Sequence, residues 1–126
     1  YINNLCVKFK LSHKDCFIIG FSQGAMMAFE FGKYVNHSFA GCVLLSGRIL
    51  PSADHKKKNF IETPLLIVHG DQDTVLEPTY FEEACKIIKN QGFLFDSYLM
   101  ENEGHTVSAE TLKLTKNFIK KHMTQT

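Results

Sequence analysis

The sequence lacks the features that would indicate a nucleic-acid-binding, membrane-spanning or metal-binding protein. Its 14 lysines and arginines nearly balance its 13 aspartates and glutamates, and the net charge of +1 argues against a general nucleic-acid binder. No apolar run is long enough to span a membrane, and we expect no signal peptide. The cysteines lack metal-ligand spacing, so we expect neither a metal nor another cofactor. They are Cys6, Cys16, Cys42 and Cys85.

The rest of the composition is that of one folded domain. The chain has 126 residues, of which 44% are hydrophobic, enough for a single modest core. Neither repeats nor linkers divide it, so we expect residues 1–126 to form one domain. The cysteine usage favours a reducing, cytoplasmic location. Because the first residue is Tyr1 and not methionine, we expect that upstream residues were removed or that the chain is a piece of something longer.

Strands and helices are predicted to alternate along the chain. Four apolar runs that end in turn residues predict strands, the last of them less apolar and therefore nearer an edge. They lie at about residues 15–20, 39–47, 63–70 and 93–99. Helices are predicted after the first, third and fourth strands, ending at about residues 35, 91 and 122. This order predicts an α/β fold, with a parallel sheet of about four strands and flanking helices.

Several details of these elements can also be predicted. The helix that ends near residue 35 begins apolar all round, so its first turns should be buried. Residues 1–11 fit either the end of a helix or a strand. His13 and the three lysines at residues 56–58 are expected in solvated loops. The closing helix is expected to bury Leu112, Thr115, Phe118 and Ile119.

One stretch organises the rest of the chain. The apolar run at residues 16–19 ends in Gly-Phe-Ser-Gln-Gly at residues 20–24, and helix formers follow. Strand, sharp turn and helix are the setting of a nucleophile elbow with Ser22 at its apex. Gly20 and Gly24 are expected where a side chain would collide with the crossing strand and helix. The alternative is a glycine-rich turn with an incidental serine.

Two further candidates follow predicted strands. Asp73 lies in the loop after residues 63–70, and His105 lies in the loop after residues 93–99. Since the carboxyl ends of parallel strands meet at one rim, Ser22, Asp73 and His105 should lie together there. A serine needs a base to take its proton, a histidine can be that base, and a carboxylate can orient the histidine. The order Ser, Asp, His is that of the α/β-hydrolases.

Each candidate has a competing interpretation. Asp71 is a rival to Asp73, although it directly follows a glycine and is better placed to brace the loop; either aspartate could cap a turn. His105 could be an ordinary loop histidine. His69 lies within a predicted strand and is expected to be a packed, hydrogen-bonded histidine. The three signals at Ser22, Asp73 and His105 are stronger jointly than singly.

These residues resemble the phospholipase/carboxylesterase family, to which the acyl-protein thioesterases belong. The similarity rests on Gly-Phe-Ser-Gln-Gly-Ala at residues 20–25, Leu-Ser-Gly at 45–47, Val-His-Gly-Asp-Gln-Asp-Thr-Val at 68–75 and Glu-Gly-His-Thr at 103–106. It implies an α/β-hydrolase fold with Ser22 as nucleophile, Asp73 as acid and His105 as base. The backbone N–H of Gln23 would be one oxyanion donor. The implied reaction is hydrolysis of carboxylic esters or thioesters, with a small-molecule ester or acyl substrate.

The resemblance covers only the C-terminal half of the family's domain. Members are considerably longer, and their nucleophile lies near the middle of the chain. The early strands and the loop with the second oxyanion donor are expected to be absent, which would impair the activity of this chain alone. The alternatives are an inert hydrolase remnant or a binding or dimerisation module. The apolar strand at residues 16–19 would lie at an exposed edge, where a homodimer could form.

Overall fold

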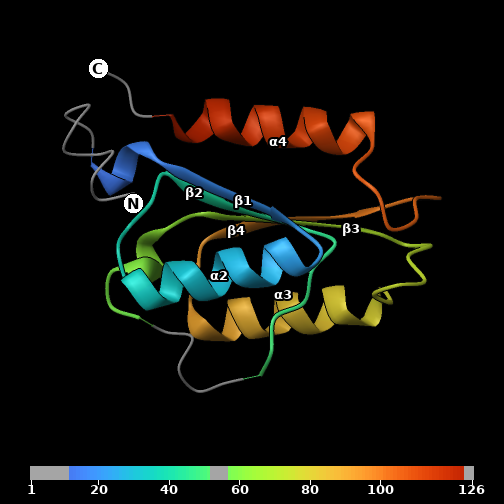
Figure 1. The fold of residues 1–126 in the computed structure, drawn as a ribbon, viewed down its shortest axis with the longest axis horizontal. Coiled ribbons are helices and arrows are strands. Elements are labelled where there is room, and N and C mark those ends of the chain that lie inside the picture. Colours follow the sequence, from blue (N-terminus) through green and yellow to red (C-terminus); the bar gives the residue numbers. More distant parts are fainter. Residues whose placement is uncertain (1–11, 52–56, 124–126) are drawn as a thin grey trace.

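A four-stranded parallel sheet forms the centre of the computed structural model, which describes residues 12–51 and 57–123 (Figure 1). The strands lie side by side in sequence order: β1 (Phe17–Phe21), β2 (Gly41–Leu45), β3 (Leu65–Gly70) and β4 (Phe95–Met100). Phe21 lies opposite Leu45, and Gly70 lies opposite Met100. The carboxyl ends of neighbouring strands are therefore level and form one rim. The predicted α/β fold with a parallel sheet is confirmed.

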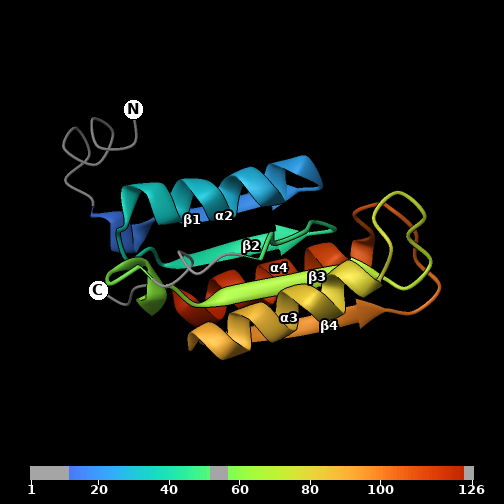
Figure 2. The ribbon, with the colours of Figure 1, turned by 90° about the horizontal axis from the view of Figure 1, so that it is seen from below.

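Helices cover both faces of the sheet. α4 (Ala109–His122) lies on one face, and α2 (Gln23–Val35) and α3 (Thr79–Gln91) lie on the other, as Figure 2 also shows. β2 and β3 are buried along their whole length, because helices cover them from both sides. Their side chains alternate between two clusters. Cys42, Leu44, Leu65 and Ile67 join the larger cluster with Phe29, Phe60 and Ile88, whereas Val43, Leu45, Leu66 and Val68 pack with Phe118.

The helix ends follow from local chemistry. α2 ends at Asn36, whose left-handed backbone lets its N–H bond to the carbonyl of Gly32. α3 ends at Gly92, which also adopts a positive φ, a conformation that glycine reaches without steric cost. α4 begins at Ser108, whose side chain accepts a hydrogen bond from the backbone N–H of Thr111. Local capping thus sets where α2 and α3 end and, at Ser108, where α4 begins after the last loop of the rim.

Two predictions about buried faces were wrong. The first turns of α2 are not buried all round, since Met27 is 71% exposed while Ala25 and Ala28 face the sheet. α2 lies over the edge of the sheet, and among the described residues no strand lies beyond β1 to cover its outer side.

In α4, Leu112 is exposed and its neighbour Thr111 is buried instead, together with Thr115 and Phe118. The two threonines can be buried because the hydroxyl of Thr115 donates to the carbonyl of Thr111.

The two edges of the sheet agree with the sequence. β4 is less apolar and lies at one edge of the described sheet, as predicted, and β1 lies at the other. His13 begins a short 3-10 helix, and its ring stacks on that of His37. The prediction for residues 1–11 and for Lys56 falls outside the described residues. Over the described ranges, the structure contains no helix with the length and apolar character needed to cross a membrane.

Candidate active site

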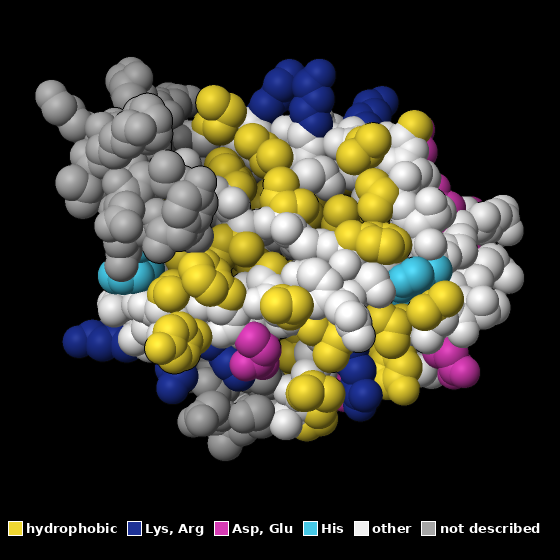
Figure 3. All heavy atoms as spheres, in the orientation of Figure 1, with side chains coloured by type: hydrophobic (Ala, Val, Ile, Leu, Met, Phe, Trp, Pro, Cys, Tyr) yellow, Lys and Arg dark blue, Asp and Glu magenta, His cyan; other side chains and the backbone are white. Residues whose placement is uncertain are grey.

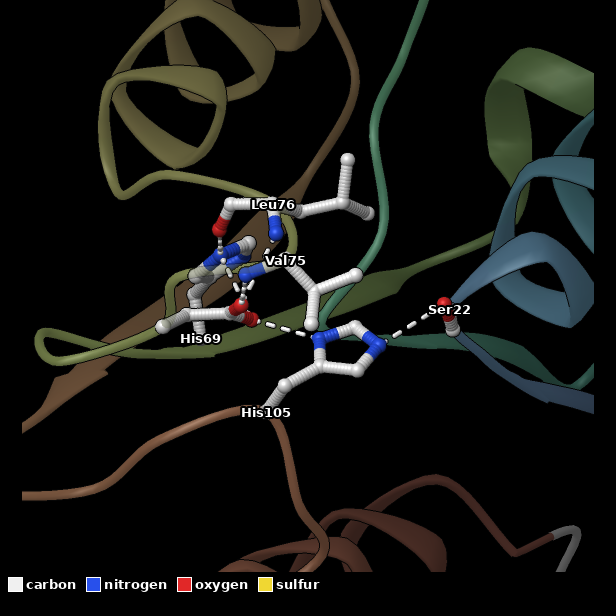
Figure 4. A network of polar contacts seen from close by, with 6 residues as sticks. Ser22, His69, Val75, Leu76 and His105 are labelled. Carbon is white, nitrogen blue, oxygen red and sulfur yellow. Dashed lines mark hydrogen bonds and ion pairs between the residues drawn. The ribbon is translucent and has the colours of Figure 1, made fainter.

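Ser22 lies at the apex of the turn between β1 and α2. Its backbone has φ 58° and ψ −121°, a strained conformation for a residue with a side chain. The turn is held because the N–H of Ser22 donates to the carbonyl of Leu45 on β2, at 2.8 Å. The strand, sharp turn and helix predicted between residue 16 and about residue 35 are thus present, and the side chain of Ser22 projects from the rim (Figure 4).

The two glycines around Ser22 have different roles. A Cβ on Gly20 would lie 2.1 Å from the carbonyl oxygen of Gly24, so only glycine fits there. A Cβ on Gly24 would meet nothing within 4 Å in the described structure. The expected collision is therefore correct for Gly20 and wrong for Gly24, because the crossing helix presses backbone atoms against β1 but turns Gly24 outward.

Asp73 lies in the loop that follows β3, and its side chain is completely buried. Its Oδ1 accepts hydrogen bonds from the backbone N–H groups of Val75 and Leu76, at 2.9 and 2.8 Å. Its Oδ2 lies 2.7 Å from Nδ1 of His105, which comes from the loop after β4. The loop therefore presents one carboxylate oxygen to its own backbone and the other to the histidine.

The structure brings Ser22, His105 and Asp73 together in one row (Figure 4). His105 Nε2 lies 2.9 Å from Ser22 Oγ. Because an ionised carboxylate only accepts hydrogen bonds, Nδ1 of His105 donates to Asp73, which leaves Nε2 free to accept from the Ser22 hydroxyl. This arrangement allows the imidazole to take the hydroxyl proton, while the carboxylate holds the ring in the tautomer that does so.

The carboxylate of Asp73 is kept ionised by its hydrogen bonds. Burial by itself would raise the pKa of Asp73. The hydrogen bond from His105 and those from the N–H groups of Leu76 and Val75 outweigh that effect and hold the pKa below its ordinary value. A charged Asp73 is thus available at neutral pH to stabilise a protonated His105.

An open depression of about 500 Å³ lies in front of Ser22. As the first residue of α2, Gln23 has a backbone N–H without an acceptor inside its own helix, and the helix dipole adds partial positive charge there. The depression is mostly apolar, and the ring of Phe21 also lies against that of His105, with centroids 4.9 Å apart. Its lining residues are Phe21, Ser22, Gln23, Met26, Val75 and Leu76.

The two rival residues have other partners. Asp71 Oδ1 accepts from the backbone N–H of Asn102 at 2.8 Å, which braces the loops after β3 and β4 as expected. His69 is buried and bonded to the carbonyl of Leu76, so the prediction of a packed, hydrogen-bonded histidine is confirmed. Within residues 12–51 and 57–123, no three His, Cys, Asp or Glu side chains are grouped to hold a metal ion.

Sequence reasoning missed how the loop after β3 holds its aspartate. The backbone N–H groups of Val75 and Leu76 and the ring of His69 all lie around Asp73. The signal was present in the sequence, because an aspartate commonly bonds the backbone N–H two or three residues further on. The contact of His69 follows from the reversal of the chain after Gly70, which the hydrophobic pattern does not describe.

The fold and the turn at Ser22 place the chain in the α/β-hydrolase class. More narrowly, the sequence model of the family described as Phospholipase/Carboxylesterase matches residues 2–123, and the chain belongs to that family.

Two curated relatives illustrate the match. Acyl-protein thioesterase 1 homolog 1 of Dictyostelium discoideum is 33% identical over 115 residues, which cover 89% of this chain and 50% of that protein. Acyl-protein thioesterase 1 of Candida albicans is 30% identical over 128 residues, which cover 90% of this chain and 54% of that protein. The chain thus spans about half the length of the curated relatives it matches.

Solved structures agree on the fold. The crystal structure of esterase PE8 superposes with a TM-score of 0.86 at 26% identity, over 96% of this chain and 56% of that one. The structure of Arabidopsis thaliana SOBER1 superposes with a TM-score of 0.87 at 22% identity, over 96% of this chain and 59% of that one. The described sheet and helices therefore correspond to one part of a larger α/β-hydrolase domain.

Proposed function

We propose that this chain carries the nucleophile, base and acid of a hydrolase that acts on carboxylic esters or thioesters. The observation that carries the proposal is the row of contacts from Ser22 Oγ through His105 to Asp73, with distances of 2.9 and 2.7 Å. Such a row, at the tip of a strained strand-to-helix turn, is the arrangement that activates a serine. Family membership supports the same reaction class.

The proposed reaction has two stages. His105 takes the proton of Ser22 while Oγ attacks the carbonyl carbon, and the negative charge on the carbonyl oxygen is met by the N–H of Gln23. His105 then gives the proton to the leaving alcohol or thiol, and an acyl-serine remains. In the second stage, His105 activates a water molecule that attacks this ester, and the carboxylic acid is released as Ser22 regains its proton.

We propose an acyl group of some length as the part of the substrate that the depression receives. Phe21, Met26, Val75 and Leu76 give it an apolar lining directly in front of Ser22. The curated relatives are described as acyl-protein thioesterases, which supports an acyl thioester as one substrate class. The free thiols of Cys42 and Cys85 support a reducing, cytoplasmic location.

We further propose that residues 1–126 by themselves react slowly. In α/β-hydrolases a second oxyanion donor comes from the loop after the third strand of the fold, which precedes the nucleophile strand along the chain. Among the described residues the nucleophile strand β1 is the first strand, so they do not include that loop. The loss of one donor costs about 2.7–4 kcal/mol of transition-state stabilisation, or about 10²–10³ in rate. On activated short esters we therefore expect turnover well below the typical value of ~10 per second.

A fluorophosphonate probe tests the proposal, because it modifies only an activated serine. We expect covalent labelling of the wild type at Ser22, found by peptide mass mapping, and none in Ser22→Ala. His105→Ala should also lose labelling although its serine is intact. An unlabelled wild type would favour the inert remnant, and turnover near ~10 per second by this chain alone would contradict the incomplete oxyanion hole.

We propose that the edge strand β1 can pair with the same strand of a second copy. Hydrophobic side chains cover much of the face that β1 and α2 present in Figure 3. β1 contains neither proline nor a charged residue, the devices that normally protect an edge. Pairing about a two-fold axis would cover the exposed apolar side chains. These are Ile19, Phe21, Met27, Phe31 and Tyr34.

Sedimentation equilibrium at micromolar concentration tests this pairing. We expect a dimer for the wild type and a monomer for Ile19→Lys, because Ile19 is half exposed on β1. Leu99→Lys is the matched control, since Leu99 has similar exposure on β4 at the opposite edge. A wild type that sediments as a clean 14.4 kDa monomer would refute the dimer.

A further inference from the structure

His69 is a buried titratable residue at the site that the proposed reaction does not use. It is the last but one residue of β3, and only 1% of its surface is exposed. Its ring faces α3, where the ring of Phe81 lies at a centroid distance of 6.2 Å. A leucine or phenylalanine would satisfy packing alone at such a position, so the polar contacts of the imidazole require an explanation.

The polar contacts of His69 fix where its proton lies. Nε2 is 2.7 Å from the carbonyl oxygen of Leu76 and 3.3 Å from Oδ2 of Asp73. A carbonyl oxygen and an ionised carboxylate both only accept hydrogen bonds. Nε2 therefore carries a proton, which it donates to the carbonyl of Leu76. The same N–H group also lies near the carboxylate of Asp73.

Leu76 is the link between His69 and the carboxylate. Its carbonyl accepts from His69, and its own N–H donates to Oδ1 of Asp73 at 2.8 Å. Figure 4 shows His69, Val75 and Leu76 around the carboxylate end of the row, with Ser22 at the opposite end. The bond from His69 closes the turn between β3 and residue 76, so the peptide groups that hold Asp73 cannot drift away from β3.

We propose that His69 is a positioning residue that holds the Asp73 carboxylate on His105 by fixing the backbone at Leu76. The effect of this positioning on catalysis rests on the proposed function. The location of the His69 proton on Nε2 does not depend on that function. His69 also bears on the lining of the depression, because Leu76, to which it bonds, is one of the lining residues. Loss of the His69 donor should therefore affect both the activation of Ser22 and the fit of the acyl group.

Two variants separate hydrogen bonding from packing. His69→Gln places an amide N–H₂ donor near the position of Nε2, whereas His69→Leu fills a similar volume without any donor. We expect His69→Leu to slow fluorophosphonate labelling of Ser22 about 10–100-fold, by analogy with metal sites, where loss of the hydrogen-bond partner that orients a ligand costs about this much. His69→Gln should recover most of that loss. Equal losses in the two variants would mean that His69 only packs.

Histidine NMR of the ¹⁵N-labelled wild type decides the structural part without any activity. We expect His69 to carry its proton on Nε2, and the proton between His105 and Asp73 to resonate far downfield. That downfield resonance should broaden or vanish in His69→Leu and return in His69→Gln. A proton on Nδ1 alone of His69, or a downfield resonance unchanged in His69→Leu, would refute the proposal. If the wild type shows the expected resonances but the fluorophosphonate probe does not react with Ser22, only the proposed function is refuted.

Discussion

The two sides of the candidate site differ in how much of their surroundings this chain supplies. The carboxylate of Asp73 is completely buried, and two backbone N–H groups and the ring of His105 bond to it. Gln23 and Gly24, immediately after Ser22, are exposed, and β1 beneath them is an edge strand of the described sheet. The proposed acid is thus enclosed by its own chain, while the proposed nucleophile is enclosed on one side only.

The difference follows from the position of each strand. β3 lies between β2 and β4 and has helices on both faces, so the loop after it rests on a complete layer of structure. β1 has a neighbour on one side alone among the described residues, yet the strained backbone of Ser22 is still held by the close approach of Gly20 to Gly24. We infer that the acid side keeps its geometry without help and that the nucleophile side sets the limit on activity.

The largest expected effect distinguishes the two aspartates. Asp73→Asn should slow labelling of Ser22 about 10⁴-fold, because the amide favours the wrong tautomer of the histidine. Asp71→Asn is the matched control, two residues away. It retains an acceptor for the N–H of Asn102, so we expect labelling within about threefold of the wild type. Rates of fluorophosphonate labelling measure both effects. Similar losses of rate in the two variants would mean that the assignment of Asp73 as the acid is wrong.

The next effect tests how firmly the nucleophile side is held. Gly20→Ala would place a methyl group 2.1 Å from the carbonyl oxygen of Gly24, so the crossing of β1 and α2 would have to open. We expect the free energy of unfolding to fall by about 3 kcal/mol, the upper end of the usual cost of overpacking. Urea denaturation measures it. A loss below about 1 kcal/mol would mean that the turn yields easily and does not constrain Ser22.

Much of this arrangement could be predicted from the sequence. The apolar runs gave the four strands within about two residues, because buried parallel strands are continuously apolar and end in turn residues. The order of Ser22, Asp73 and His105 after three different strands predicted their meeting at one rim. Asp71 could be assigned to the loop because it follows Gly70 directly, and it does bond the loop after β4.

The parts that sequence could not predict depend on tertiary neighbours. Leu112 and Thr111 are adjacent, and only the crossing of α4 over the sheet decides that the threonine is the buried one. Met27 is apolar and yet 71% exposed on α2, so its apolar character alone does not report its exposure. His69 was correctly placed in the interior, but its bond to Leu76 needs the reversal of the loop.

A smaller effect is expected from pH on the contribution of Asp73 to the free energy of unfolding. The folded pKa of Asp73 lies below the unfolded value of 3.8, so ionised Asp73 stabilises the fold at neutral pH. This stabilisation is complete well above pH 3.8 and is lost as the pH falls through the folded pKa. The difference in unfolding free energy between wild type and Asp73→Asn should therefore shrink from about pH 6 toward about pH 2. Urea denaturation across that range tests it, and a constant difference would contradict a lowered pKa.

The smallest expected effect concerns the open side. Gly24 lies in the first turn of α2, and a Cβ there would meet nothing within 4 Å in the described structure. Alanine has a higher helix propensity than glycine and loses less chain entropy on folding, so Gly24→Ala should raise the free energy of unfolding by about 0.5–1 kcal/mol. Gly20→Ala and Gly24→Ala should therefore change the free energy of unfolding in opposite directions, although the two glycines are only four residues apart. A loss of stability in Gly24→Ala would mean that something covers this turn in solution, and the nucleophile side would then be more enclosed than its exposed backbone indicates.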